Sequence, residues 1–340
     1  MRSGIIAGGN WIVDHVKRID TWPPQDALAS ILSESWGNGG SPYNLLKNLS
    51  RFGATFPREA VGLVGNDESG RIIQADCTAH GVDQTQLRIT EAAPTSYTDV
   101  MTEVSTSRRT FFHQRGANAL LAPEHFDFST TRAKLFHLGY LLLLDALDGP
   151  GADGLPKAAE VFRRARAAGL LTSADCVSEH GDRFTSVVAP LLPEVDLLFA
   201  NDFEAEKVTG LQLGRGKTLN KAAVEAAGGE LLRRGVREWV FIHFPEGVCA
   251  CSANGERVWQ ASVKMPVDAI AGTAGAGDAL ASGVLYGWHE AWPMQKALEL
   301  GVCAAAASLR HPTCSDAVGS LDECLGLGAR FGFQATPVRS

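Results

Sequence analysis

The chain has 340 residues, 45% of them hydrophobic, which is enough for one large domain or two small ones. Its formal net charge of −7 disfavours bulk electrostatic binding to nucleic acids or anionic membranes, so neither is an expected partner. The seven cysteines are scattered without metal-site spacing, which favours a reduced, cytoplasmic setting. We expect neither a signal peptide nor a membrane span, because no apolar run is long enough for either.

The N-terminal part of the chain alternates between strand and helix signals. Residues 4–7 are apolar and end at a glycine pair, which predicts a first strand. A Ser-Pro pair suits the N-terminus of a helix that we expect over 42–51. Residues 61–64 predict another strand, and a helix over about 67–81 follows it. This succession favours a parallel sheet.

A different pattern interrupts the alternation. Residues 97–104 and 109–114 are rich in Thr, Val, Tyr and Phe, and a Ser-Thr-Ser segment separates them, which predicts a β-hairpin. A hairpin inside an α/β pattern is often a separate flap. We therefore expect one α/β domain over 1–340 with a small β lid formed by about 11–36 and 95–115.

The aromatic and the basic side chains of the lid region can each be interpreted in two ways, as binding groups or as structural and solvated ones. Trp11, Tyr97, Phe111 and Phe112 could stack on a sugar or a base, or they form lid core, which we favour for Phe111 and Phe112. The arginines could meet an anionic substrate, but we expect them to be solvated, as is usual at a hairpin tip; they are Arg108, Arg109 and Arg115.

The second part of the chain returns to the α/β alternation. We expect strands over 134–138, 170–175, 196–200, 238–242 and 248–251, and helices over 156–168, 220–234 and 294–310. The whole pattern predicts a doubly wound, mainly parallel α/β sheet with the small lid attached.

The most informative segment is a turn of small residues that runs into a helix. Gly275, Ala276 and Gly277 carry almost no side chain, so their amides can face an anion at the positive end of that helix. Asp278 stands in the first turn, beside this anion site. Phosphoryl transfer to a hydroxyl needs both donors for the moving charge and a base for the proton. The alternative is a glycine-rich turn that caps an ordinary helix.

A second polar pair follows a predicted strand. Asn201 and Glu204 lie where the strand ends and a helix begins, and ligands bind at the carboxyl ends of strands in open α/β sheets. Their oxygens could organise a hydrated Mg²⁺ that carries phosphates. The alternative is a capping box, in which the two residues satisfy the start of the helix.

Three segments together resemble signatures of the ribokinase-like (PfkB) carbohydrate kinase family. Thr-Ala-Gly-Ala-Gly-Asp at 273–278 is similar to its C-terminal signature, Gly-Gly-Ser-Pro-Tyr-Asn at 39–44 to its N-terminal signature, and Asn-Asp-Phe-Glu at 201–204 to its Asn-x-x-Glu motif. The resemblance covers nearly the whole chain. It implies a ribokinase-like fold and the use of ATP and Mg²⁺.

The resemblance also implies residue roles. It makes Asp278 the base that takes the proton from the acceptor hydroxyl, and Gly275, Ala276 and Gly277 the anion hole. Further residues are implied to bind the hydroxyls of a sugar or nucleoside (Asp14, Gly39, Gly40 and Asn44), the nucleotide (Thr273 and Gly247), and the phosphates through water-bound Mg²⁺ (Asn201 and Glu204). The lid would close over the substrate, and a homodimer formed through the lid is an expected assembly.

Two positions depart from the family pattern. The C-terminal signature usually begins with Asp, where this chain has Gly272, and the strand before the nucleotide site often ends in Thr, where this chain has His243. A K⁺ ion beside the anion hole would lack a balancing carboxylate at 272, so we expect little or no activation by K⁺. We interpret His243 as a packed or solvent-facing loop residue.

Three functions therefore remain open. The main interpretation is an ATP-dependent kinase of a sugar or related polyol, and the alternative within enzymes is a nucleoside kinase. A non-catalytic nucleotide or sugar sensor on the same fold is disfavoured by Asp278, because a sensor needs no base.

Overall fold

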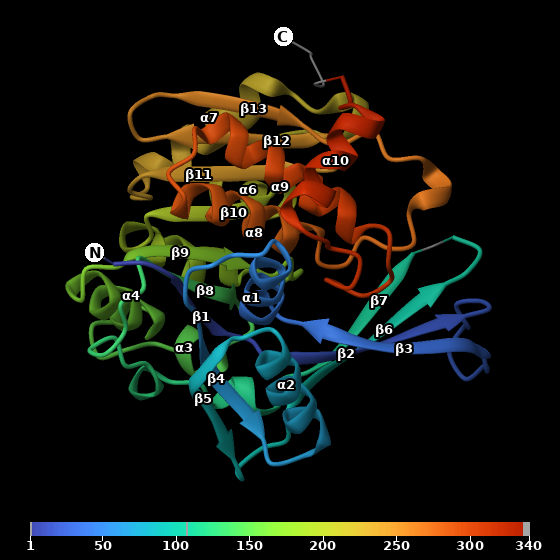
Figure 1. Cartoon of the computed structure of the whole chain (residues 1–340), viewed down its shortest axis with the longest axis horizontal. Coiled ribbons are helices and arrows are strands. Elements are labelled where there is room, and N and C mark those ends of the chain that lie inside the picture. The colour runs from blue at the N-terminus through green and yellow to red at the C-terminus, as the bar shows by residue number, and fades with distance from the viewer. Residues whose placement is uncertain (1, 107, 336–340) are drawn as a thin grey trace.

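A nine-stranded sheet forms the centre of the molecule (Figure 1). The computed structural model describes residues 2–106 and 108–335. The strands are β1 (Ile5–Gly9), β4 (Arg58–Gly65), β5 (Asp83–Thr90), β8 (Leu135–Leu141), β9 (Leu171–Cys176), β10 (Leu197–Asn201), β11 (Trp239–Phe244), β12 (Gly247–Ser252) and β13 (Arg257–Ala261). Their order is β13-β12-β11-β10-β9-β8-β1-β4-β5. All pairings from β11 to β5 are parallel, whereas β12 and β13 add an antiparallel edge.

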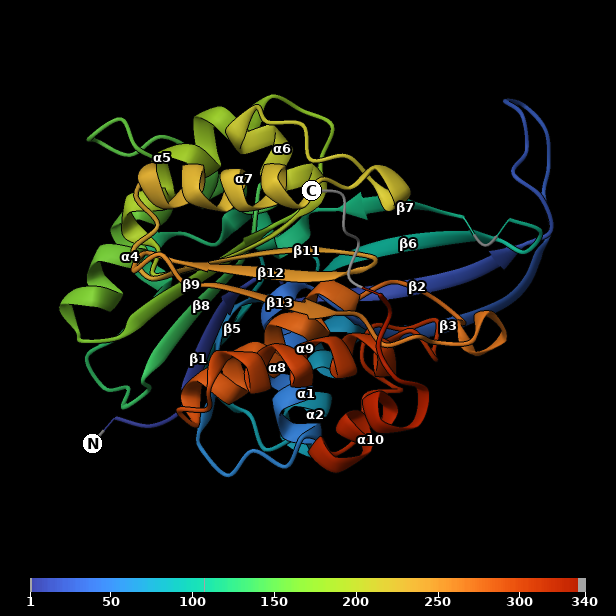
Figure 2. The same ribbon diagram turned by 90° about the horizontal axis from the view of Figure 1, so that it is seen from above.

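Helices cover both faces of this sheet, as Figure 2 shows. One face carries α1 (Ser41–Arg51), α2 (Glu68–Ala79), α8 (Ala276–His289), α9 (Met294–Ser308) and α10 (Leu321–Phe331), and the other carries α4 (Ala158–Ala167), α5 (Ala189–Leu191), α6 (Asp202–Thr209) and α7 (Lys221–Arg233). The short α3 (Asp145–Asp148) follows β8. Each face has its own cluster of buried apolar side chains. A sheet covered on both faces explains why β1 is buried along its whole length.

A second sheet of four strands projects from one end of the molecule (Figure 1). It contains β2 (Ile12–Ile19), β3 (Ile31–Gly39), β6 (Ser96–Glu103) and β7 (Arg109–Gln114), in the order β3-β2-β6-β7. Strands β6 and β7 pair antiparallel, so the predicted hairpin is confirmed. The parallel pairing of β2 with β6 joins the two segments expected to form the lid.

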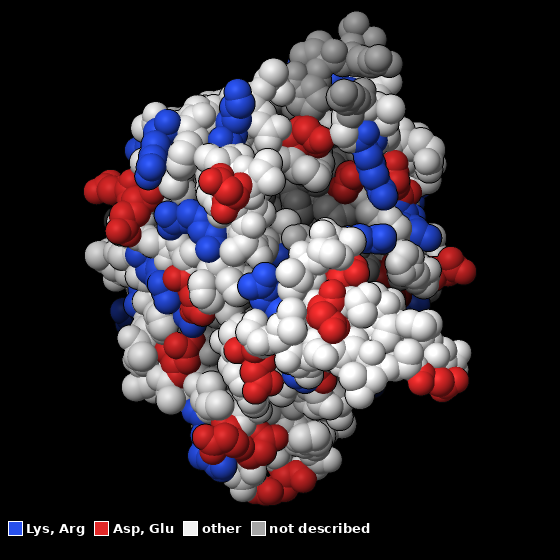
Figure 3. Space-filling model, turned by 90° about the vertical axis from the view of Figure 1, so that its right-hand side faces the viewer, with Lys and Arg blue, Asp and Glu red and all other residues white. Residues whose placement is uncertain are grey.

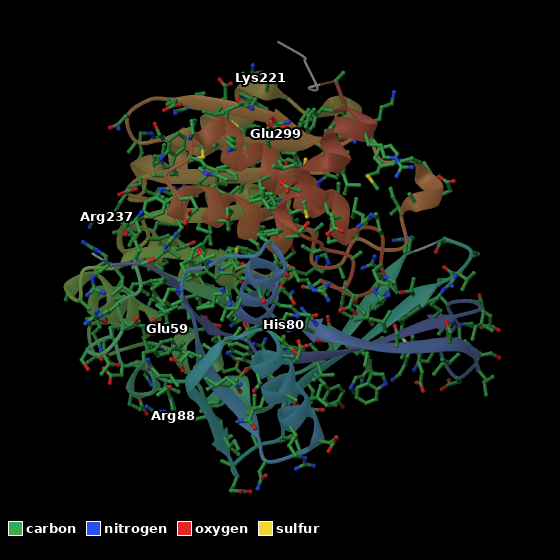
Figure 4. All side chains as sticks on the ribbon, in the orientation of Figure 1. Glu59, His80, Arg88, Lys221, Arg237 and Glu299 are labelled. Atoms are coloured by element: carbon green, nitrogen blue, oxygen red, sulfur yellow. The ribbon has the colours of Figure 1, made fainter. Side chains whose placement is uncertain are left out.

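The parallel strands point their carboxyl ends toward the four-stranded sheet. Glu59, near the start of β4, and Arg237, just before β11, lie on the opposite side of the molecule (Figure 4). The carboxyl edge is where ligands bind in such sheets, so the four-stranded sheet stands next to the expected site. None of the helices in the described residues combines the length and hydropathy of a membrane span.

The predicted doubly wound α/β fold is confirmed, and the expected strands and helices are present with ends shifted by a few residues. Sequence reasoning did not identify β5, β13 or α10. Strand β5 lies at a sheet edge and is largely polar, so its sequence lacks a strong strand signal. Helix α10, in contrast, starts with a capping box of Ser320 and Glu323 that is visible in the sequence.

Candidate active site

A cavity of about 970 Å³ lies between the carboxyl edge of the large sheet and the four-stranded sheet. Figure 3 looks onto this end of the molecule and shows its surface hollowed. The four-stranded sheet forms one side of the cavity, and the ends of β10 and β11 form the other. All predicted site residues except Gly39 and Gly247 line it, namely Asp14, Gly40, Asn44, Asn201, Glu204, Thr273, Gly275, Ala276, Gly277 and Asp278.

The turn before α8 has the conformation that its small residues allow. Gly275 adopts a left-handed φ of 73° as the N-cap, and a Cβ there would lie 2.5 Å from the Cβ of Cys314. Any other residue at 275 would therefore be strained and would also collide with its neighbour. The turn brings the first amides of α8 to the cavity, where the helix dipole favours an anion.

The carboxylate of Asp278 lies between the two sides of the cavity and is held through one oxygen. Its Oδ2 accepts hydrogen bonds from Asn44 Nδ2 at 2.6 Å and from the hydroxyl of Tyr140 at 2.7 Å. Asn38 donates to Asn44 Oδ1 at 2.6 Å, which directs the Asn44 amide nitrogen at Asp278. Burial raises the pKa of Asp278 to about 6, and the charge of Asp175 adds to the rise. Asp278 is therefore ionised at neutral pH and has become a stronger base.

Asp14 enters the cavity from β2. Burial raises its pKa to about 7, although hydrogen bonds from Cys314 and Thr98 oppose the rise. Gly39 lies on the neighbouring strand β3, diagonally across from Asp14, and a Cβ at this position would come within 2.6 Å of the Asp14 carboxyl carbon. Gly39 does not line the cavity itself; it leaves the space that the Asp14 carboxylate occupies. Its neighbour Gly40 takes a left-handed φ of 89° as the N-cap of α1.

Asn201 and Glu204 form the capping box at the start of α6. Asn201 Oδ1 accepts from the Glu204 amide, and Glu204 Oε2 accepts from the Asn201 amide, each at 2.9 Å. The hydroxyl of Ser178 and the Asn201 side chain donate to Glu204 Oε1. Glu204 is buried, and burial raises its pKa to about 7. The predicted capping box is confirmed, and both residues also line the cavity, so their predicted role at a hydrated Mg²⁺ stays a prediction.

The donor set around Glu204 fits a hydrated metal ion better than a directly bound one. Both carboxylate oxygens already accept hydrogen bonds from protein groups. Among residues 2–106 and 108–335, no cluster of three or more His, Cys, Asp or Glu side chains has the arrangement of a metal site. A divalent ion here would therefore keep most of its water ligands, as Mg²⁺ does when phosphates carry it.

His243 lies in β11 rather than in a loop, because that strand continues to Phe244. Its ring faces the turn before α8, where a Cβ at Gly277 would lie 3.2 Å from Cε1. Burial lowers the pKa of His243 to about 4, so the ring is neutral at neutral pH. The interpretation as a loop histidine was therefore wrong, and His243 lines the cavity beside the anion site.

Several cavity residues escaped the sequence analysis. Tyr140 bonds Asp278 from the end of β8. Asp175, at the end of β9, accepts from the Ser41 hydroxyl at 2.6 Å, and His137 lies within 3.4 Å of the same oxygen. Asp175 closes a predicted strand, so the rule that pointed to Asn201 could have pointed to it as well.

The aromatic side chains of the lid region lie in three places: the core, the cavity and the outer face. Trp11 is fully buried and stacks on Tyr43, so it belongs to the core. Phe111 lines the cavity, whereas Phe112 lies on the outer face and stacks on Trp22. The lid-core interpretation of Phe111 and Phe112 was therefore wrong for both, because each is more than half exposed.

The comparisons agree with this geometry. A family model described as "pfkB family carbohydrate kinase" matches residues 10–319. An ATP-dependent ribose-1-phosphate kinase of Halopiger xanaduensis is 29% identical over 89% of this chain and 90% of its own length. An adenosine kinase of Dictyostelium discoideum is 26% identical over 74% of this chain and 72% of its own length.

The same fold is found in a ribokinase from Arabidopsis thaliana, solved with ribose and ATP, at a TM-score of 0.77 and 19% identity, with 96% of this chain and 99% of that chain covered. The match of the family model extends over most of the chain and includes the turn before α8, the segment 39–44 and the pair Asn201 and Glu204. The chain therefore belongs to the pfkB family of carbohydrate kinases and is a phosphoryl-transferring sugar kinase.

Proposed function

We propose that the enzyme transfers the terminal phosphoryl group of ATP to a sugar hydroxyl with Asp278 as the general base. The observation that carries this proposal is the position of Asp278 in the first turn of α8, inside the cavity and next to the amides of 275–277. Its Oδ2 is engaged by Asn44 and Tyr140, while Oδ1 has no hydrogen bond in the described part of the chain. Oδ1 would take the hydroxyl proton as the sugar oxygen attacks phosphorus.

The side of the cavity formed by β10 and β11 would hold the nucleotide. Asn201 and Glu204 would hydrogen-bond the waters of a Mg²⁺ ion, and Thr273 would lie near the phosphates, whereas Gly247 lies outside the cavity lining and is no longer expected to bind the nucleotide directly. Bound Mg²⁺ would neutralise charge on the transferred phosphoryl group. The amides of 275–277 and the neutral ring of His243 supply donors on the same group. With Gly272 in the signature, no monovalent cation is required.

The four-stranded sheet would act as a lid over the sugar. Asp14, Gly40 and Asn44 line the cavity beneath it and would bind sugar hydroxyls. Closure would exclude water, which otherwise competes as phosphoryl acceptor. The relative that acts on ribose 1-phosphate makes a pentose or its phosphate the first acceptor to test. A nucleoside is the second, because Phe111 exposes an aromatic face to the cavity.

A homodimer through the four-stranded sheet is supported by its exposed apolar side chains. Trp22, Leu32, Trp36 and Phe112 each expose close to half or more of their surface. Such a concentration of exposed large apolar groups is typical of an interaction surface. Sedimentation of the parent and a Trp36→Glu variant would test it: a dimer that the substitution dissociates is expected, and a monomeric parent would refute it.

The function is tested by ADP release from MgATP with a panel of acceptors. The panel contains ribose, fructose, ribose 1-phosphate, ribose 5-phosphate and adenosine, and mass spectrometry identifies the phosphorylated product. We expect turnover with at least one sugar or sugar phosphate, and its loss in Asp278→Asn. Binding without turnover for every acceptor would instead support the sensor.

A further inference from the structure

Arg109 lies beside the active-site cavity, next to the lining residues of β7 but not among them, and it has no ionic partner among the described residues. Its side chain makes no hydrogen bond or ion pair with any of residues 2–106 and 108–335, and its Nη1 is buried and unpaired. Burial lowers its pKa, which reflects the cost of keeping the charge there. A buried charged donor that stays unpaired is expensive, so the site is incomplete without an anion.

The register of β7 places Arg109 on the cavity side of the four-stranded sheet. Alternate residues of a strand share a face, so Arg109, Phe111 and His113 project together. Phe111 and His113 both line the cavity. The Nδ1 atom of His113 lies 3.0 Å from the Thr98 hydroxyl, and its Nε2 is buried and unpaired. The same face therefore carries two buried nitrogen atoms, Arg109 Nη1 and His113 Nε2, that have no hydrogen-bond partner among the described residues.

Gly272 makes room for the guanidinium. A Cβ at this position would lie 2.7 Å from Arg109 Nη2. An acidic side chain at 272 would therefore reach Arg109 and neutralise it within the protein. Cys314 and Asp14 oppose the lowering of the Arg109 pKa, but Asp14 forms no ion pair with Arg109 in the described residues. Glycine at 272 leaves the guanidinium available to a ligand.

We propose that Arg109 binds a phosphate group carried by the acceptor sugar, so that the substrate is a sugar phosphate. The proposal rests on the function proposed above. Arg109 belongs to the same sheet as Asp14 and Phe111, on the side that would hold the sugar, and opposite Asn201 and Glu204. The planar guanidinium can donate two parallel hydrogen bonds to two oxygens of one phosphate group. Burial lowers the pKa of His113 to about 4, so its ring is neutral and would add a further polar contact.

The test compares a sugar phosphate with its unphosphorylated parent in four proteins. The substrates are the best sugar phosphate of the acceptor panel and the same sugar without phosphate. The proteins are the parent enzyme, Arg109→Gln, Arg109→Lys and Arg108→Gln. Arg108 is the exposed neighbour of Arg109 and serves as the matched control. KM and kcat are measured separately for each substrate, and thermal unfolding checks the fold.

We expect Arg109→Gln to raise the KM for the sugar phosphate by about 30-fold or more, with kcat changed by less than about threefold. For the neutral sugar, kcat/KM should change by less than about threefold. The KM of Arg109→Lys for the sugar phosphate should lie between those of the parent and Arg109→Gln, because lysine keeps the charge but cannot form the two parallel hydrogen bonds. Equal losses with both substrates would overturn the proposal, as would an enzyme that phosphorylates only neutral sugars. No turnover with any acceptor would refute the proposed function instead.

A second pair of variants tests the same site from the other side. Gly272→Asp supplies Arg109 with an internal carboxylate, and Gly272→Asn supplies the same bulk without the charge. We expect the Asp variant to raise the KM for the sugar phosphate about tenfold over the Asn variant. That difference should vanish when Arg109→Gln is added, since the two side chains then no longer interact. Equal KM values for the two variants would contradict the proposal.

Discussion

On the β10 side of the cavity, both carboxylate oxygens of Glu204 accept hydrogen bonds from the protein, whereas the side formed by the four-stranded sheet has buried polar atoms without a partner in the described residues. Glu204 accepts from Ser178 and from Asn201, and the same residues cap a helix. Across the cavity, Arg109 Nη1 and His113 Nε2 are buried without partners in the described residues. The proposed nucleotide side is thus tied into the fold by the hydrogen bonds of Asn201 and Glu204, while we propose that a ligand completes the sugar side.

Asp278 lies between these two sides, and its proposed role as base is the same whichever sugar is bound. Asp278→Asn keeps the shape and removes the proton acceptor, so we expect kcat to fall by about 10² to 10⁴-fold. The loss should be the same for a neutral and a phosphorylated sugar, unlike the loss in Arg109→Gln. Steady-state kinetics and calorimetric binding measure the two effects. A kcat within about threefold of the parent would rule out the assigned role.

Glu204→Gln should affect only the proposed nucleotide side of the cavity, by weakening the use of Mg²⁺. Glutamine can still accept from the Asn201 amide, so the helix cap and the melting temperature should be nearly kept. Loss of the charge should raise the Mg²⁺ concentration for half-maximal rate by about 10- to 100-fold, with the sugar KM unchanged. A Mg²⁺ titration at fixed ATP gives the result. An unchanged titration would leave Glu204 with its capping role alone.

Deprotonation of Asp14, on the four-stranded-sheet side of the cavity, should lower the free energy of unfolding of the ligand-free enzyme as the pH rises. Its pKa is about 7 in the folded state and lower in the unfolded chain, so its contribution is fully present below about pH 4 and is lost as the pH rises through 7. Asp14→Asn should therefore lose less stability than the parent between pH 5 and pH 8, by about 1–2 kcal/mol. Urea unfolding at both pH values measures the difference; identical pH dependence would show that Asp14 does not carry it.

The smallest expected effect concerns K⁺ at the turn between the two sides. Because Gly272 brings no carboxylate and Arg109 lies against it, the rate in potassium should stay within about twofold of the rate in a bulky organic cation at equal ionic strength. A several-fold advantage of potassium would mean that another acidic residue supplies the missing ligand.

How far the sequence predicted the site depends on how local each feature is. The turn of 275–277 with Asp278 and the pair of Asn201 and Glu204 are contiguous signals, and the structure places both in the cavity. The contact of Arg109 with Gly272 joins positions far apart in the chain. No local pattern encodes such a contact, because it depends on the register of β7 and on how the four-stranded sheet approaches the loop before α8. The expectation that Arg109 is solvated rested on its place near a hairpin tip, which carries no information about Gly272.

Part of what was missed was nevertheless readable. Alternation along 109–114 already puts Arg109, Phe111 and His113 on one face, and a lid must turn one face to its ligand. The capping-box pattern of Ser320 and Glu323 likewise predicts the start of α10. The hydrogen bond from Tyr140 to Asp278, in contrast, depends on how β8 meets α8 and has no signal in either segment.

The close approach of Gly39 to Asp14 has a consequence for redesigning the acceptor pocket. Any side chain at 39 would displace the Asp14 carboxylate, so position 39 should not be varied even though Gly39 does not line the cavity. Phe111 is the opposite case: its ring lines the pocket with 57% of its surface exposed, so it can be exchanged without disturbing packing. A library aimed at new acceptors should vary 111 and leave 39 alone.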